Sequence, residues 1–436
     1  MKMNDIIFER FAAISTKQWK QKIQYELQGL DYQKTLVKSS ADGIPQLPFY
    51  SESELKYRSI ADFPKKINTC IYITVNNEAT ANTKAVNAIN SGFTNICFTI
   101  FNAELDMDIL LQNISVSTFI IPHFLNIDSY KKIQANYPQV TVLSDPIGKI
   151  TQTGNWYRNF NHDFEQLDLI LNHSPSSLTI NQSLFHDAGA TPVQQLAYSL
   201  TQLKQYDHQI SLKKCNTITY FVAVGTDFFI EIAKLKALRI LTNSYFESQN
   251  ITLNCLLFQQ KSQRTIQLFD SDINHEISSI ECQIGQCAGV DFITAYPENY
   301  LYFKEDIPII NAQNKLLIQN IKNSSIPIND AIYIEKLTQQ LIDKTLVLFE
   351  SIEQGGGFTN QLRKGIIQKK IKEKESAEQK AFNQQFTVTT PTTKKTPIHY
   401  PFLKTKGHSP FWKPIIKKRL TAPQEKPIWD KLYSNG

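Results

Sequence analysis

Short apolar segments alternate with helical patterns over most of the chain. The apolar segments are rich in Ile, Val, Phe or Thr and are mostly apolar on both faces, which is typical of buried parallel strands. They predict strands at residues 70–75, 95–100, 116–121, 139–144, 177–181, 217–223, 251–256 and 290–295. Helices are predicted between them, including residues 79–91, 127–135, 192–205 and 227–244. This alternation predicts a (β/α)8 TIM-type barrel; a doubly wound open sheet is the alternative, because periodicity does not show closure.

The expected helix over 227–244 illustrates the pattern. Phe228, Ile232, Leu235 and Leu238 fall on one helical face, and Lys234 falls on the opposite face. Thr226 or Asp227 can cap its start. We therefore expect one buried face and one solvated face.

Bulky residues at alternate strand positions are expected to fill the barrel axis. The side chains expected there are Phe98, Ile100, Phe119, Ile121 and either Tyr220 or Phe221.

Two extensions flank the predicted barrel of residues 51–365. Residues 1–50 form an N-terminal arm with an amphipathic helix at 16–29, where Trp19, Ile23 and Leu27 recur every four residues. Residues 366–436 begin with a very polar helix and continue as an irregular tail, which holds seven of the eighteen prolines after Thr390.

Charge is concentrated in the tail. The whole chain of 436 residues carries +6, and residues 391–436 hold ten Lys and Arg against two acids, a net of +8. The remainder has no basic excess, so we expect no nucleic-acid partner. Aromatic residues within the tail suit docking on a protein, although nucleic-acid binding and a solvated linker remain alternatives. No membrane span or signal peptide is recognisable, so a cytoplasmic protein is expected.

Few residues suggest chemistry. The six cysteines show no CxxC spacing and are expected to be buried and reduced, and no metal-ligand pattern occurs among the eight histidines. Gly355, Gly356 and Gly357 lack the residues of a phosphate-binding loop and are expected to end a helix. His186 and Asp187 follow the strand at 177–181, so they are expected at the carboxyl rim, where barrel enzymes place catalytic groups. They are the candidate acid/base pair; the alternative is a loop or capping role.

Several long segments resemble the small subunits of methylmalonyl-CoA mutases. They include DPIGKITQTGNWYRNF, LFHDAGATPVQQLAYSL, VGTDFFIEIAKLKALRIL and YIEKLTQQLIDKTLVLFESIEQGGGF. The resemblance runs from about Ser15 to Leu420 with the right order and spacing. It implies a barrel subunit that pairs with a larger catalytic chain, in propionate metabolism. In that family the catalytic chain holds acyl-CoA along the barrel axis and binds adenosylcobalamin.

The catalytic residues of that family do not carry over to this sequence. Aligning on Ala188, Gly189 and Ala190 places Ser183 and Leu184 where catalytic chains have a Tyr-His pair. The cobalt-ligating DxHxxG motif does not occur, so this chain is expected to have no cobalamin-binding domain and no cofactor of its own. The resemblance therefore implies a non-catalytic isomerase subunit. A subunit of a related acyl-CoA mutase and an independent barrel enzyme using His186 and Asp187 are the alternatives.

Overall fold

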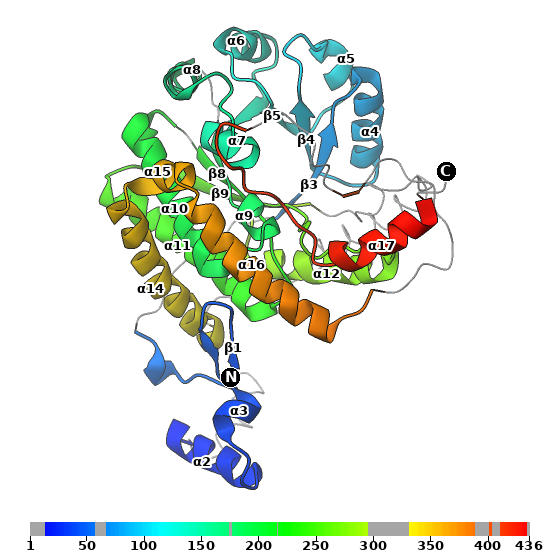
Figure 1. Ribbon diagram of the computed structural model, residues 1–436. Helices are drawn as coiled ribbons and strands as arrows, with labels where there is room; N and C mark the ends of the chain where they lie inside the picture. Colours follow the sequence, from blue (N-terminus) through cyan, green and yellow to red (C-terminus); the bar gives the residue numbers. More distant parts are fainter. Residues whose placement is uncertain are drawn as a thin grey trace, which may run out of the picture.

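The computed structural model describes residues 14–56, 67–173, 177–215, 217–294, 331–388, 401–402 and 410–433. Within these residues the strands form a closed barrel of parallel strands, in the order β10-β3-β4-β5-β6-β7-β8-β9 (Figure 1). The barrel strands are β3 Asn68–Thr74, β4 Asn95–Ile100, β5 Ser117–Pro122, β6 Val140–Ser144, β7 Ser177–Asn181, β8 Thr217–Val222, β9 Asn254–Gln259 and β10 Phe292–Ile293. This closure confirms the predicted TIM-type barrel and rules out the open sheet.

One strand is displaced from its expected position. β9 begins at Asn254 and not at Ile251. The Ile251 N–H donates to the Phe246 carbonyl at 2.9 Å, and the Ile251 side chain is buried in the main core. This apolar residue therefore packs against the end of the preceding helix before the chain enters the sheet.

Helices surround the barrel and follow the expected segments closely. Those between strands are α4 Glu78–Asn90, α5 Met107–Leu111, α6 Ile127–Asn136, α7 Pro146–Thr153, α8 Phe160–His173, α9 Ser183–Asp187, α10 Pro192–Gln209, α11 Phe228–Ser248 and α12 Ser271–Ala288. Those after the barrel strands are α14 Ile332–Gln354, α15 Gly357–Arg363, α16 Ile366–Gln385 and α17 Ala422–Tyr433. The short elements outside the barrel are α3 Tyr32–Leu36, β1 Lys38–Ser39, β2 Pro45–Gln46, η1 Glu52–Glu54 and η2 Leu212–Lys214. As expected, the glycine cluster ends α14, with Gly355 as its C-cap.

The prediction that α11 has a solvated face at Lys234 is wrong. Lys234 is fully buried, because its ammonium points toward α10 and the end of β8, where Gln195 Oε1 and the Ala223 carbonyl accept its hydrogen bonds. Asp227 does occupy the N-cap position, but its side chain makes no capping hydrogen bond. Its carboxylate accepts a hydrogen bond from Gln46 Nε2 at 3.0 Å instead, which ties α11 to the N-terminal arm.

Phenylalanine rings fill the barrel axis. Phe258 stacks on Phe292 with ring centroids 3.9 Å apart, and it meets Phe119 edge-on at 4.9 Å and Phe221 edge-on at 5.8 Å. Cys70, Cys97 and Leu143 complete this cluster. Aromatic rings in these edge-to-face contacts close the space along the axis among the described residues.

The inward faces match the prediction on two strands and contradict it on a third. Phe119, Ile121 and Phe221 point inward as predicted, and Tyr220 points to the outer core. Phe98 and Ile100 were wrongly assigned, because both pack between the strands and the helices while Cys97 faces the axis. β4 is apolar on both faces, so its sequence does not reveal which residues point inward.

The second half of the N-terminal arm is anchored in the barrel core, and its first half projects away from the barrel. Ile44 and Tyr50 are buried in the main core. Helix α2, Thr16–Glu26, has no buried residue, and it lies beyond the barrel helices with α3 (Figure 1). Trp19 makes an edge contact with Phe49, yet 42% of Trp19 remains exposed.

A segment of the tail crosses the barrel, and we call residues 410–421 the strap. The strap is the red segment that runs from beside α7 to α17 in Figure 1. The Trp412 N–H donates to the Gly154 carbonyl at 2.9 Å, and the Ile415 N–H donates to the Thr151 carbonyl at 2.8 Å. Ile415 is buried in the main core. The expectation of an irregular tail holds for the strap, but it is wrong for residues 422–433, which form α17. Glu425 and Trp429 are buried there, so tertiary packing stabilises a helix that contains Pro427.

Candidate functional site at the barrel rim

The candidate site is built from the carboxyl ends of three consecutive strands. β7 leads into α9, which carries His186 and Asp187; β8 leads into α11, which carries Lys234; β9 leads to Ser262. The structure therefore places His186 and Asp187 at the carboxyl rim, as the sequence predicts. The strap lies against the same rim.

His186 is held in a defined orientation. Its Nε2 lies 3.0 Å from Ser262 Oγ, and its Nδ1 lies 3.5 Å from Gln195 Nε2. Gln195 is oriented by two other contacts, because its Oε1 accepts from Lys234 Nζ at 2.9 Å and its Nε2 donates to the Ala190 carbonyl at 2.7 Å. An amide N–H thus faces Nδ1, which makes Nδ1 the acceptor and Nε2 the donor to Ser262.

This arrangement leaves the imidazole poorly suited to act as a base. A general base needs a free lone pair directed at the proton to be removed, and the Nε2 that faces Ser262 carries a hydrogen. Burial, together with the positive charges of Lys234, Arg264 and Lys417, holds the pKa of His186 well below its usual range. His186 is therefore a neutral, hydrogen-bonded group of the rim.

Asp187 binds other partners than His186. Its Oδ1 accepts from the Gln263 N–H at 2.9 Å, and its Oδ2 lies 3.2 Å from Lys417 Nζ of the strap. Its backbone carbonyl accepts from the Lys418 N–H at 2.8 Å. Burial raises the pKa of the Asp187 carboxyl, while Lys417 opposes that shift. The structure brings His186 and Asp187 to one rim but does not join them in an acid/base pair.

Ser183 and Leu184 lie deeper in the rim. Ser183 Oγ donates to Asn181 Oδ1 and is also 2.7 Å from Gln260 Oε1. Leu184 is 1% exposed and belongs to the main core. An aliphatic side chain offers no hydrogen-bond donor, so position 184 cannot polarise a carbonyl group.

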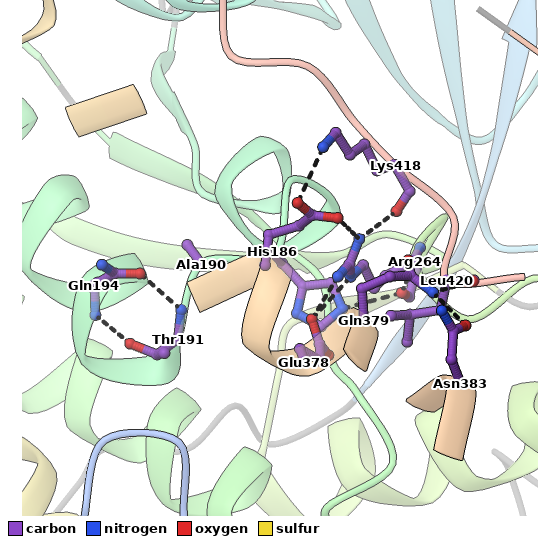
Figure 2. A network of polar contacts seen from close by, with 12 residues as sticks. His186, Ala190, Thr191, Gln194, Arg264, Glu378, Gln379, Asn383, Lys418 and Leu420 are labelled. Atoms are coloured by element: carbon purple, nitrogen blue, oxygen red, sulfur yellow. Dashed lines mark hydrogen bonds and ion pairs between the residues drawn. The ribbon is translucent and has the colours of Figure 1, made fainter. Parts of the chain in front are cut away.

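Arg264 is the rim residue that the sequence did not reveal. Its guanidinium donates to Glu378 Oε2 at 2.6 Å and to the Lys418 carbonyl at 2.9 Å, so it joins α16 to the strap (Figure 2). Lys418 Nζ in turn lies 3.0 Å from Glu375 Oε2. These partners are more than a hundred residues from Arg264 in the sequence, so no local pattern could predict the network.

Lys234 is a second buried cation that the sequence did not reveal. Its Nζ donates to Gln195 Oε1 and, at 2.8 Å, to the Ala223 carbonyl, and it forms an ion pair with Glu231. A buried ammonium is tolerated when it is paired and hydrogen-bonded in this way. Lys234 therefore acts as a structural support for Gln195 and, through it, for His186.

Other candidate chemistry gains no support from the geometry. No group of three or more His, Cys, Asp or Glu in the described residues is placed to hold a metal ion. All six cysteines are free, and five of them are buried. Burial raises the pKa of the Cys70, Cys97, Cys255 and Cys282 thiols, which keeps them unreactive. None of the helices in the described ranges has the length and apolar character of a membrane span.

The family model for methylmalonyl-CoA mutase matches residues 139–394. The chain belongs to the methylmalonyl-CoA mutase family. The matched range includes β6 to β10, α16, and the rim residues His186, Asp187, Lys234 and Arg264, whereas the strap lies outside it. The barrel expected from the resemblance is therefore confirmed.

Three relatives show how this mutase-family chain relates to known proteins. A methylmalonyl-CoA mutase small subunit from Porphyromonas gingivalis is 25% identical, over 85% of this chain and 68% of that protein. A small subunit from Propionibacterium freudenreichii is 25% identical over 53% of this chain and 36% of that protein. A methylmalonyl-CoA mutase from Rhizobium meliloti is 27% identical over 47% of this chain and 31% of that protein. The match thus spans about a third of the length of the last two relatives.

Proposed function

We propose that this chain is a non-catalytic small subunit of a heterodimeric, adenosylcobalamin-dependent methylmalonyl-CoA mutase. A larger catalytic chain carries out the interconversion of methylmalonyl-CoA and succinyl-CoA. The relatives named as small subunits support this role, and so does the chemistry of the barrel.

The filled barrel axis carries the proposal. An acyl-CoA lying along the axis needs an open passage for its long, flexible arm. In this chain Phe119, Phe221, Phe258 and Phe292 contact one another across that space. Close-packed interiors of this kind do not admit a ligand without moving several side chains.

The rim gives the same indication. Leu184 replaces the hydrogen-bond donor that the family resemblance would require, and His186 donates its Nε2–H to Ser262. Neither side chain can stabilise a developing oxyanion in this arrangement. We therefore assign no catalytic residue to this chain.

The His186 rim also offers no ligand for cobalamin. Cobalt ligation needs an accessible imidazole nitrogen, and both ring nitrogens of His186 face hydrogen-bonding partners inside a buried rim. We propose that the cofactor is bound by the partner chain alone.

The N-terminal arm is the proposed contact with that partner. An isolated helix of 11 residues is marginally stable in water, and α2 buries none of its own side chains here. Ile14, Tyr25 and Leu30 are 68%, 85% and 65% exposed. A partner surface over Trp19, Ile23 and Leu27 would supply the packing that α2 lacks.

Co-expression with a large-subunit homologue that carries the DxHxxG motif tests the proposal. We expect a one-to-one complex in sedimentation, with mutase activity only when the large chain is present. A chain that stays alone in the presence of that homologue would argue against pairing. Turnover of an acyl-CoA by this chain alone would overturn the non-catalytic role.

The competing role of an independent barrel enzyme is tested at His186. In the assembled heterodimer, His186→Ala should change kcat by less than about tenfold, which corresponds to roughly 1.4 kcal/mol. A loss on the order of a thousandfold with assembly intact would show that His186 takes part in catalysis.

A further inference from the structure

Three side chains from neighbouring βα units meet at the carboxyl rim, away from His186. Phe101 directly follows β4, His123 directly follows β5, and Lys149 lies on α7, which follows β6. The carboxyl ends of barrel strands are where this fold presents binding groups. None of these residues contributes to the His186 rim described above.

Phe101 and His123 form a stacked pair. Their ring centroids are 4.3 Å apart with an interplanar angle of 26°. The His123 N–H donates to the Ile100 carbonyl at 2.8 Å, which fixes the two adjoining strand ends together. Phe101 is nevertheless 55% exposed, so an aromatic surface backed by an imidazole is presented to solvent.

Lys149 is a half-buried cation, and the carboxylate whose charge acts on it is that of Asp163. Its Nζ lies over the ring of Tyr157, 5.2 Å from the ring centroid. The Tyr157 hydroxyl donates to the Pro122 carbonyl at 3.3 Å, one residue before His123. Tyr157 therefore holds Lys149 beside the stacked pair.

The nearby acid Asp163 is already engaged. Its Oδ2 accepts from the Tyr157 N–H at 2.7 Å, and its Oδ1 accepts from the Arg158 N–H at 3.1 Å. Burial followed by the Lys149 charge lowers the pKa of His123, and burial lowers the pKa of Lys149 against the opposing charge of Asp163. Two basic side chains, His123 and Lys149, thus lie near each other and are partly buried. A bound anion would stabilise their charged forms.

We propose that Phe101, His123 and Lys149 form a binding site for a nucleoside phosphate. The flat base stacks on the exposed face of Phe101, because base–aromatic stacking suits any purine or pyrimidine. The phosphate lies against the Lys149 ammonium and accepts the ring N–H of His123. This site is independent of the proposed subunit role.

Calorimetric titration of the full chain with AMP, adenosine and inorganic phosphate tests the proposal. We expect AMP to bind more tightly than either fragment, because only AMP uses both the ring and the charge. Coenzyme A, as a fourth ligand, distinguishes a free nucleotide from the nucleotide end of a larger cofactor. Tighter binding of coenzyme A than of AMP would identify the larger cofactor as the source.

Two variants and a control separate the contributions. Lys149→Gln should weaken AMP binding at least tenfold, and Phe101→Leu should weaken AMP while leaving the affinity for phosphate unchanged. Lys132→Gln removes the same charge from the exposed surface of α6 and should leave AMP binding unchanged. Absence of AMP binding at millimolar concentration, or equal loss in Lys149→Gln and Lys132→Gln, would overturn the proposal.

Discussion

Gly154 and Trp412 approach so closely that no side chain fits between them. A β-carbon built on Gly154 would lie 2.0 Å from the Trp412 carbonyl oxygen and 2.6 Å from Pro410 Cβ. Gly154 also has φ +75°, and its own carbonyl accepts the Trp412 N–H. The strap can therefore dock only because residue 154 is glycine.

Gly154→Ala should release the strap. The left-handed backbone alone costs about 1–2 kcal/mol for a non-glycine residue, and the clash with Trp412 adds about 1–3 kcal/mol more. Hydrogen exchange should rise across residues 410–421 while the barrel strands remain protected. Gly365→Ala is the matched control, because φ there is +73° but nothing lies within 4 Å of the added carbon. Equal exchange in the two variants would contradict the role of Gly154.

The lowered pKa of His186 predicts a pH dependence of stability. The unfolded chain takes up a proton near pH 6.5, while the folded chain keeps His186 neutral to lower pH. Protons therefore favour the unfolded state, and the free energy of unfolding falls as pH drops below about 6.5, by at most about 1.4 kcal/mol per pH unit from this group.

His186→Gln should remove this component. The difference in free energy of unfolding between variant and wild type, measured in denaturant titrations from pH 7.5 to pH 5, should shift in favour of the variant as pH falls. His208→Gln changes an exposed histidine of α10 and serves as the control. Parallel pH profiles for His186→Gln and the wild type would show that His186 titrates normally.

The aromatic axis makes Phe258 a large contributor to stability. Phe258 is fully buried and contacts Phe119, Phe221 and Phe292. Phe258→Ala should lower the free energy of unfolding by about 3–5 kcal/mol, because the cavity cannot collapse inside a closed barrel. Phe411→Ala, at a ring that is 78% exposed, should change it by no more than about 0.5 kcal/mol. Similar effects of the two variants would mean that the axis is loosely packed.

Deleting the first part of the N-terminal arm should affect heterodimer affinity much more than the stability of the isolated chain. Removing residues 1–30 should weaken the heterodimer strongly and lower the melting temperature of the isolated chain only slightly, because α2 buries no side chain in it. Ile23→Ser should weaken pairing as well, whereas Gln21→Ser on the exposed surface should not. Affinity that is unchanged after truncation would assign α2 to the barrel and not to the interface.

Local patterns predicted most of the secondary structure. The strand at 177–181 and the start of the helix at 192 agree with β7 and α10, because Thr191 forms a capping box with Gln194 and Pro192 occupies the first turn. Such signals depend on neighbouring residues alone. The displacement of β9 arose because Ile251 has a strand-like side chain but packs against α11.

The sequence predicted where the rim residues His186 and Asp187 lie but not which partners they bind. The order of strand and helix places His186 and Asp187 at the carboxyl end, and the resemblance identified position 184 as lacking a donor. The tautomer of His186 depends on Gln195, whose orientation depends in turn on Lys234. Each of these contacts joins a different element, so adjacency in the sequence could not indicate that His186 and Asp187 bind separate partners.

The sequence alone determined the strand–helix alternation, the family resemblance and the amphipathic N-terminal helix, because alternation, spacing and amphipathic patterns are properties of contiguous residues. Tertiary structure decided which face of β4 points inward, that Lys234 is buried, and that the strap of the basic tail docks on the barrel rim. Lys417 reaches Asp187 across 230 residues of sequence, and only the folded barrel brings that carboxylate and the strap together. The closed axis is likewise a result of packing, since four phenylalanines from four strands meet only when the sheet closes on itself.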